Sequence, residues 1–229
     1  MEKIEVAKRE RAAVTIKSIK DGASPRPLLR ALVAGANIVR SDNLYKLPDE
    51  LPVPIDDGAA NHLTGAVLPD FSLTSTSGDQ INLYRSGGLN IVFCYPRTGR
   101  PNEEALGGTE NWNSIPGARG CTPQACSYRD KFSELEDLGA NLYGLSTQDT
   151  EYQKEAVSRL GLPYKLLSDS NLQFLENLNL PFFKIGDTVL LKRITLIIQN
   201  GIVSHYFYPV YPPNSDAENV LSWISANGN

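Results

Sequence analysis

Residues 90–95 (NIVFCY) form a short, largely apolar run, and this run constrains the fold more than any other part of the sequence. A strand with one wet face alternates polar and apolar residues, whereas a continuous apolar run is typical of a strand that is buried on both faces. Both faces of the sheet must then be covered by other elements. The run therefore predicts a central strand in a layered α/β domain.

Strand and helix patterns alternate around this run. The expected strands are residues 70–76, 81–85, 141–145, 165–167, 189–198 and 202–208. The expected helices are residues 122–138, 149–160, 171–178 and 216–226. Asn200-Gly201 joins the last two strands as a hairpin, because this dipeptide readily takes positive φ angles. The alternation predicts a three-layer α/β/α sandwich.

The first 62 residues have a different character and are predicted to be a helical N-terminal extension with a linker, followed by the main domain over residues 63–229. Residues 2–20 mix charged and apolar residues, and residues 28–39 are a second helical candidate after Pro25 and Pro27. KLPDELPVPIDDG then reads as an extended linker. Two interpretations stay open: a helical cap on the main domain, or an arm for targeting or partner binding.

Composition excludes several classes of protein. The chain has 229 residues and carries 22 Lys and Arg against 26 Asp and Glu, a balance that argues against a dedicated nucleic-acid binder. No apolar run reaches the roughly 18 residues of a membrane helix, and the first residues lack the apolar stretch of a secretory signal. We therefore expect a soluble, cytoplasmic protein without a membrane partner. Three cysteines do not make a secreted disulfide framework, and in a reducing compartment a cysteine pair indicates catalysis or metal binding.

The segment GARGCTPQACSYRD, residues 117–130, holds two of the three cysteines. Thr122 is predicted to cap a helix with Pro123 at its first position, which places Cys121 at the helix N-terminus. Free N–H groups and the positive end of the helix dipole favour the thiolate form of a cysteine there. Arg119 and Arg129 are expected to add positive charge. Cys121 is therefore a candidate nucleophile.

The spacing between Cys121 and Cys126 limits how they can react with each other. Five helical residues separate their Cα atoms by about 8–9 Å, whereas a disulfide needs about 7 Å or less. An intact helix therefore cannot carry the bridge, and its first turns must unwind if the bond forms. One cysteine can react in the folded helix, and the second can reach it after local unfolding.

The cysteines have three other interpretations: a strained structural disulfide, two unrelated buried thiols, and a zinc site. Zinc requires four ligands, and the chain offers only His62 and His205 beside its cysteines. Cys94 lies in the apolar run and fits the core better than a site. No metal and no separate cofactor is therefore expected.

At these residues the sequence resembles the peroxiredoxins of the bacterioferritin-comigratory or Q type. GCTPQACSYRD is similar to that group's signature GCT-x-E-A-C-x-F-R-D, with the same cysteine spacing. LPDFSLTSTSGDQINL, IVFCYP, the block ending in LLSD and KRITLIIQNGIV resemble further family blocks in the same order. The similarity covers about residues 65–228. It implies a thioredoxin-like fold with a mixed central sheet and an atypical two-cysteine thiol peroxidase.

The resemblance also implies roles for individual residues. Cys121 would attack a hydroperoxide and become a sulfenic acid, which Cys126 would resolve as an intramolecular disulfide. Thioredoxin or a similar dithiol would then reduce the bridge. Arg193 aligns with the family arginine and would hold the thiolate and polarise the peroxide; the alternative for Arg193 is an ion pair on an edge strand. Relatives of this type are commonly monomeric, so a monomer is expected.

The sequence departs from the family pattern before Cys121. Ala118 stands where the family has a threonine, three residues before the cysteine, and an insertion over residues 97–120 separates Tyr95-Pro96 from Cys121. Either Thr98 supplies the missing hydroxyl, or the hydroxyl is lost and the activity is reduced or redirected. The insertion is either a lid that selects the substrate or a solvated excursion; its notable residues are Glu103, Glu104, Glu110 and Trp112.

Three functions compete, and a thioredoxin-fold scaffold without chemistry is disfavoured by the presence of Cys121, Cys126 and Arg193 together. The leading one is a peroxidase that reduces hydrogen peroxide and small organic hydroperoxides. A thiol–disulfide oxidoreductase is less favoured because the expected Cys-x-x-Cys is absent. A redox sensor would oxidise Cys121 once and signal to a partner, and the loss of the threonine at position 118 is its best support.

Overall fold

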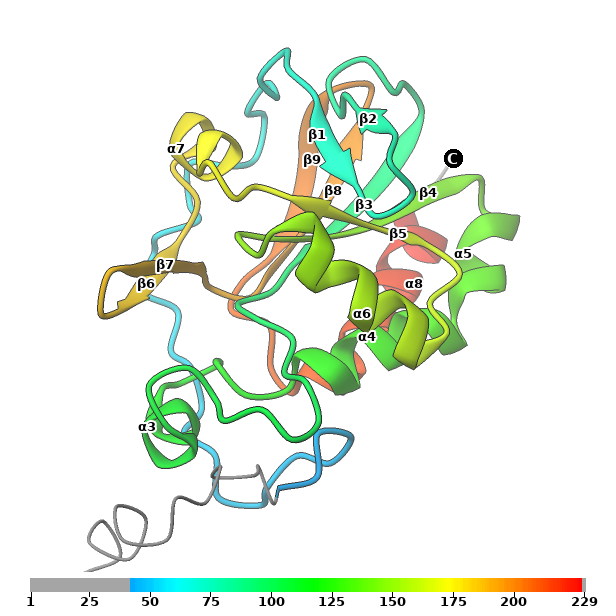
Figure 1. Ribbon diagram of the computed structural model, residues 1–229. Helices are drawn as coiled ribbons and strands as arrows, with labels where there is room; N and C mark the ends of the chain where they lie inside the picture. Colours follow the sequence, from blue (N-terminus) through cyan, green and yellow to red (C-terminus); the bar gives the residue numbers. More distant parts are fainter. Residues whose placement is uncertain (1–41, 228–229) are drawn as a thin grey trace, which may run out of the picture. The chain divides into compact units, whose positions relative to one another are not determined.

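The computed structural model describes residues 42–227 (Figure 1). The helices expected over residues 2–20 and 28–39 lie outside this range. Residues 42–62, the first described part, run as turns and extended backbone without helix or strand. No helix within residues 42–227 has both the length and the apolar character needed to cross a membrane.

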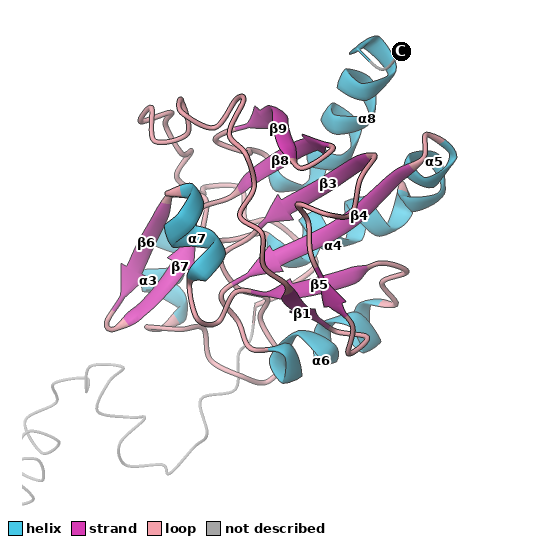
Figure 2. Ribbon diagram, turned by 90° about the horizontal axis from the view of Figure 1, so that it is seen from above, coloured by secondary structure: helices cyan, strands magenta, loops and turns pink. Residues whose placement is uncertain are grey.

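The described residues contain a mixed sheet of seven strands in the order β2-β1-β5-β4-β3-β8-β9 (Figure 2). These strands are β1 (Leu73–Ser75), β2 (Gln80–Ile81), β3 (Leu89–Cys94), β4 (Ala140–Ser146), β5 (Lys165–Ser168), β8 (Ile194–Gln199) and β9 (Ile202–Phe207). Strands β3, β4 and β5 are parallel, and β8 joins β3 antiparallel, with Val92 opposite Leu196. The apolar run is therefore a central strand, as predicted.

Elements on both faces cover this sheet. Four helices lie on one face (Figures 1 and 2): α4 (Cys121–Asp130), α5 (Phe132–Asp137), α6 (Thr150–Leu160) and α8 (Asp216–Asn227). Helix α7 (Gln173–Leu178) and buried leucines of residues 63–83 cover the other face. Phe93 faces the first layer and Val92 the second, so the side chains of β3 alternate between two buried cores. The layered sandwich is thus confirmed.

The strand predicted over residues 189–198 is wrong, because the chain changes sheets in the middle of it. Strand β7 (Thr188–Leu191) pairs with β6 (Phe182–Ile185) in a separate two-stranded sheet. At the break, the N–H of Lys192 bonds to the carbonyl of Pro181, and the carbonyl of Arg193 accepts from the N–H of Val210. Arg193 consequently lies between two strands, with its side chain buried rather than in an edge-strand ion pair.

The helix predicted over residues 122–138 also differs. It begins one residue earlier, at Cys121, and it breaks at Lys131, which has φ −107° and ψ 8° and separates α4 from α5. The N-cap of α4 is Gly120, so the predicted capping role of Thr122 is wrong. The prediction that matters for chemistry, Cys121 at a helix N-terminus, is confirmed.

The insertion over residues 97–120 is an ordered part of the domain. It contains helix α3 (Thr109–Ser114), and a short 3₁₀ helix, η1 (Pro213–Ser215), precedes α8. Ala105, Trp112 and Ala118 of the insertion pack with Leu190 of β7 in a small buried cluster. The interpretation of the insertion as a solvated excursion is therefore wrong, because its apolar side chains have a core of their own.

Gly144 in β4 provides a test of this packing. A Cβ atom at this position would lie 2.7 Å from Cζ of Phe93 and 2.5 Å from Cδ2 of Leu166, below any normal contact. Phe93 has little room to move because its ring stacks on Tyr128, with ring centroids 4.4 Å apart. We expect Gly144→Ala to lower the free energy of unfolding by about 1–3 kcal/mol, measured by urea denaturation. An unchanged denaturation midpoint would contradict this packing.

Candidate active site

Cys121 is the first residue of α4, and its position depends on the glycine before it. Gly120 has φ 109°, in the left-handed region that favours glycine. A Cβ there would also lie 2.4 Å from Cγ of Pro213 and 2.8 Å from Cδ2 of Leu47. Glycine therefore lets the chain turn sharply between two packed side chains. No side chain of the described residues caps this end of α4, which leaves its first N–H groups available to an anion at Cys121.

The guanidinium of Arg193 is the nearest positive charge to the sulfur. Its Nη2 donates to Sγ of Cys121 at 3.3 Å, although the two residues are 72 positions apart in the sequence. The same nitrogen contacts the carbonyls of the loop before the helix, at 3.2 Å for Gly117, 3.5 Å for Ala118 and 3.3 Å for Arg119. Arg193 thus places a positive charge against the sulfur and contacts the loop that precedes it.

A buried polar network lies behind this pair. Nη1 of Arg193 donates to Oε1 of Gln124, one helical turn after Cys121. Nε2 of Gln124 donates to Oδ2 of Asp216 at 2.7 Å, and Tyr128 and Thr195 donate their hydroxyls to the same oxygen. Burial raises the pKa of Asp216 above its ordinary value, and the hydrogen bonds from Gln124, Thr195 and Tyr128 and the charge of Arg193 offset this only in part.

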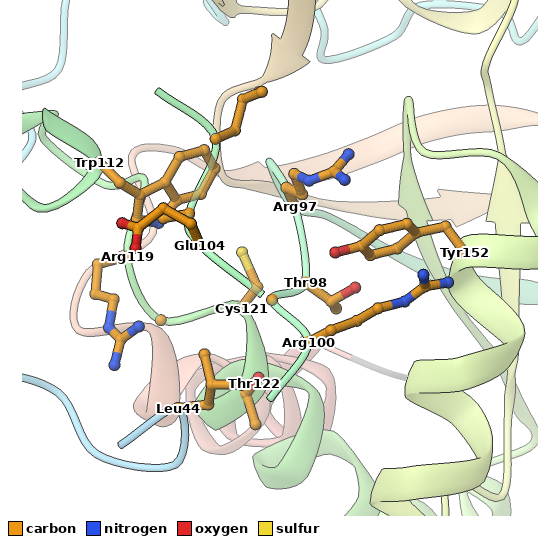
Figure 3. A pocket seen from close by; sticks show the side chains of 14 residues that line it. Leu44, Arg97, Thr98, Arg100, Glu104, Trp112, Arg119, Cys121, Thr122 and Tyr152 are labelled. Carbon is orange, nitrogen blue, oxygen red and sulfur yellow. The ribbon is translucent and has the colours of Figure 1, made fainter. Parts of the chain in front are cut away.

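A small pocket lies in front of the sulfur (Figure 3). Figure 3 shows the Cys121 side chain pointing into the space that Arg97, Thr98 and Trp112 surround. Its volume of about 20 Å³ leaves room for about one water-sized molecule. Its lining carries both kinds of charge. Glu104 lies in it together with Arg97 and Arg100, whose guanidinium carbons lie 4.2 and 3.8 Å from the ring centroid of Tyr152.

Thr98 lies in this pocket with Cys121, as the interpretation of the sequence requires. Its side chain is buried, and its hydroxyl donates to Oε1 of Gln148 at 3.1 Å, while its N–H donates to the same oxygen at 2.8 Å. This bond fixes the hydroxyl proton and leaves oxygen lone pairs available as acceptors. No hydrogen bond joins Thr98 to Cys121 within residues 42–227, so its role remains a proposal.

The two other arginines expected near the sulfur differ in position. Arg119 lines the pocket, but its guanidinium is paired with Asp42 at 2.7 Å and bonds to the carbonyls of Asn43 and Lys46. It therefore anchors the segment that precedes the domain. Arg129 lies in the last turn of α4 and donates to the carbonyl of Leu160, close to Cys126 instead of Cys121.

Cys126 and Cys94 are free thiols, as is Cys121. Cys126 lies in the same intact helix as Cys121 and is partly buried, and this burial raises the pKa of its thiol. Helix α4 therefore separates the two sulfurs in this state. Cys94 is fully buried in β3, where desolvation raises the pKa of its thiol well above the ordinary value. It is a core residue, as predicted.

Several residues of the site were missed from the sequence. Gln124 and Asp216 bond across 92 positions of the chain, and Arg97, Arg100 and Tyr152 come from the insertion and from α6, where Thr98 was the only predicted site residue. Gln124 alone had a signal, because it lies one helical turn from Cys121 on the face that carries the nucleophile. Tertiary contacts locate the other residues.

Comparison with known proteins identifies both sequence relatives and a solved structure similar to this chain. Peroxiredoxin Bcp of Escherichia coli K12 is 29% identical over 165 residues, which cover 70% of this chain and 94% of that protein. The chloroplastic peroxiredoxin Q of Arabidopsis thaliana is 27% identical over 164 residues, covering 71% of this chain and 67% of that one. The crystal structure of peroxidoxin BcpB from Mycobacterium tuberculosis matches with a TM-score of 0.58 and 24% identity, over 73% of this chain and 100% of that chain.

The structural match shows that the mixed sheet and its helices have the thioredoxin-like fold of that protein. The redoxin family model matches residues 63–221, which contain Cys121, Cys126 and Arg193. The chain therefore belongs to the redoxin family, as a peroxiredoxin of the Q or Bcp type.

Proposed function

We propose that this protein is a thiol peroxidase that reduces hydrogen peroxide and small organic hydroperoxides through Cys121. The contact of 3.3 Å between Nη2 of Arg193 and Sγ of Cys121, at the uncapped end of α4, carries the proposal. A thiolate held by a guanidinium and by free N–H groups is the nucleophile that peroxide reduction requires. Family membership supports the same chemistry.

In the proposed first step, the thiolate sulfur attacks the terminal oxygen of the hydroperoxide. A sulfur–oxygen bond forms to the terminal oxygen while the oxygen–oxygen bond breaks. The electron pair of the broken bond leaves with the other oxygen, the one that carries the alkyl group or hydrogen, and this oxygen takes up a proton to give an alcohol or water. Cys121 becomes a sulfenic acid. Arg193 stabilises the negative charge that moves from sulfur to the leaving oxygen. The small pocket favours the terminal –OOH group over bulky parts of a substrate.

In the proposed second step, the Cys126 thiol attacks the sulfenic sulfur, water leaves, and an intramolecular disulfide forms. Both cysteines lie in α4, so the helix must open first. Thioredoxin or a similar dithiol would then reduce the exposed bridge by thiol–disulfide exchange. A monomer suffices for this cycle, and a cytoplasmic setting with a dithiol reductant is part of the proposal.

Replacement of each cysteine tests the cycle. In an assay that couples peroxide reduction to NADPH through thioredoxin reductase and thioredoxin, we expect Cys121→Ser to abolish turnover, because the nucleophile is lost. Cys126→Ser should consume about one equivalent of peroxide and then stop. The matched control is Cys94→Ser, whose thiol is buried in the opposite core.

Native protein that consumes one equivalent of peroxide and then stops, with several dithiol donors, would favour a redox sensor over the peroxidase. Native protein whose Cys121 does not react with peroxide would exclude both functions.

Thr98→Val tests whether the Thr98 hydroxyl takes the place of the family threonine, whose position is occupied by Ala118 in this chain. If the hydroxyl orients the peroxide, its loss should lower kcat/KM for hydrogen peroxide roughly tenfold, equivalent to about 1.4 kcal/mol of transition-state stabilisation. Thr98→Ser keeps the hydroxyl and should retain most of the activity. Equal activity of the valine and native proteins would show that Thr98 only packs.

Tyr164 tests the opening of α4. Its hydroxyl donates to the carbonyl of Ala125 at 2.7 Å, inside the helical turn that must unwind before the cysteines meet. Because one hydrogen bond contributes about 0.5–1.5 kcal/mol, Tyr164→Phe should speed disulfide formation about twofold to tenfold after a peroxide pulse, followed by rapid alkylation of free thiols. Tyr206→Phe removes a hydroxyl that bonds to Asn61 away from α4 and is the control. An unchanged rate in Tyr164→Phe would show that opening of this turn does not limit the step.

A further inference from the structure

The carboxylate of Asp216 occupies an unusual position, at the start of α8 in the interior of the protein. Its side chain is only 1% exposed, yet Oδ2 accepts hydrogen bonds from Gln124, Tyr128 and Thr195. A carboxylate that only begins a helix needs bonds from backbone N–H groups, as Asp169 receives from Phe174 and Leu175 at the start of α7. The three side-chain donors around Asp216 instead point to a role toward the residues that present them.

Gln124 connects this carboxylate to the sulfur. Its side chain is fully buried, and its amide has two different ends. Because Asp216 accepts from Nε2, the oxygen Oε1 must face the other way, where it accepts from Nη1 of Arg193. The reverse orientation would place an NH₂ group against a guanidinium, two donors without an acceptor. Asp216 thus selects the amide orientation that Arg193 requires.

Arg193 completes the chain of contacts. With Nη1 fixed on Gln124, the plane of the guanidinium is set, and Nη2 lies on Sγ of Cys121 at 3.3 Å. The guanidinium is buried among carbonyls, an amide and a thiol. Asp216 touches neither the sulfur nor the pocket and can act only through Gln124 and Arg193.

We propose that Asp216 is a positioning residue for Cys121: through Gln124 it orients the Arg193 guanidinium on the sulfur. The inference rests on the proposed peroxidase function, but the experiment that tests it does not depend on that function. The reactivity of Cys121 toward an alkylating agent reports the state of the sulfur whether or not peroxide is turned over.

The test measures the second-order rate of Cys121 alkylation by iodoacetamide in a Cys126→Ser background, with the modified residue located by mass spectrometry. We expect Asp216→Ala to lower this rate, and the single-turnover rate with hydrogen peroxide, roughly tenfold or more, because Gln124 loses the acceptor that orients its amide. Asp216→Asn keeps an oxygen acceptor for Gln124 and should restore the rate to within about threefold of native, since orientation survives without the charge.

A matched control separates this effect from the loss of any buried carboxylate. Asp169→Ala removes the buried carboxylate that starts α7 on the other face of the sheet, and it should leave the alkylation rate of folded protein unchanged. A native alkylation rate in Asp216→Ala would overturn the proposal. Equal slowing of Cys121 alkylation in Asp216→Ala and Asp216→Asn would also overturn the proposal, because the charge of Asp216 and not the orientation of Gln124 would then control the rate.

A second variant keeps the proposal testable if Asp216→Ala folds poorly. Gln124→Met keeps the length of the side chain but removes both amide contacts, and it should slow alkylation as much as Asp216→Ala does. The double variant Gln124→Met with Asp216→Asn should be no slower than Gln124→Met alone, because Asp216 acts through Gln124. A double variant that is slower by a further factor would show a separate route and overturn the proposal. If the native protein shows no peroxide turnover but the variants show the expected alkylation rates, the peroxidase function is contradicted and the positioning role of Asp216 is supported.

Discussion

The rest of the site depends on one buried charge, the guanidinium of Arg193. A buried cation must be surrounded by acceptors, and here they come from three places: the carbonyls of residues 117–119, the amide of Gln124 and the sulfur of Cys121. The bonds of Nη1 and Nη2 therefore connect the loop before α4 with the first turn of the helix. The same contacts that stabilise the arginine in the core also hold Cys121.

Interruptions of regular structure create this arrangement. Arg193 can reach Cys121 because β7 ends at Leu191 and β8 begins at Ile194, which leaves two residues outside any strand. Cys121 faces the pocket because Gly120 turns the chain where any side chain would collide with Pro213. The insertion closes the pocket from the other side with Trp112, which is anchored in its own apolar cluster. Each break would destabilise an isolated helix or strand, but here packing against the buried core stabilises the chain at these positions.

These breaks also explain what the sequence could and could not predict. The central strand and the position of Cys121 were predictable, because an apolar run and a cysteine motif are local signals. Arg193 was a candidate only because KRITLIIQNGIV resembles a family block. The break within TVLLKRITLII, residues 188–198, was not predictable. Apolar residues typical of a strand lie on both sides of Lys192 and Arg193, although the chain passes from one sheet to the other at these two residues. The capping role of Thr122 was a reasonable local inference, but the tertiary contacts of Gly120 override it. The bond between Gln124 and Asp216 depends on the packing of α4 against α8 and has no local signal.

Helix α4 has to satisfy two opposite demands in the proposed cycle. It must be formed for Cys121 to meet Arg193, and it must open for Cys126 to reach Cys121. A strong side-chain cap at its N-terminus would stabilise the closed state by about 1 kcal/mol and would also occupy N–H groups of the first turn. Glycine at position 120 avoids both effects. The closed state is instead stabilised by tertiary contacts, those of Gln124 and Tyr128 with Asp216 and that of Tyr164 with Ala125. Once the sulfur is oxidised, it no longer offers Arg193 a negative partner, and one of the contacts that holds the first turn is weakened at the moment when the helix must open.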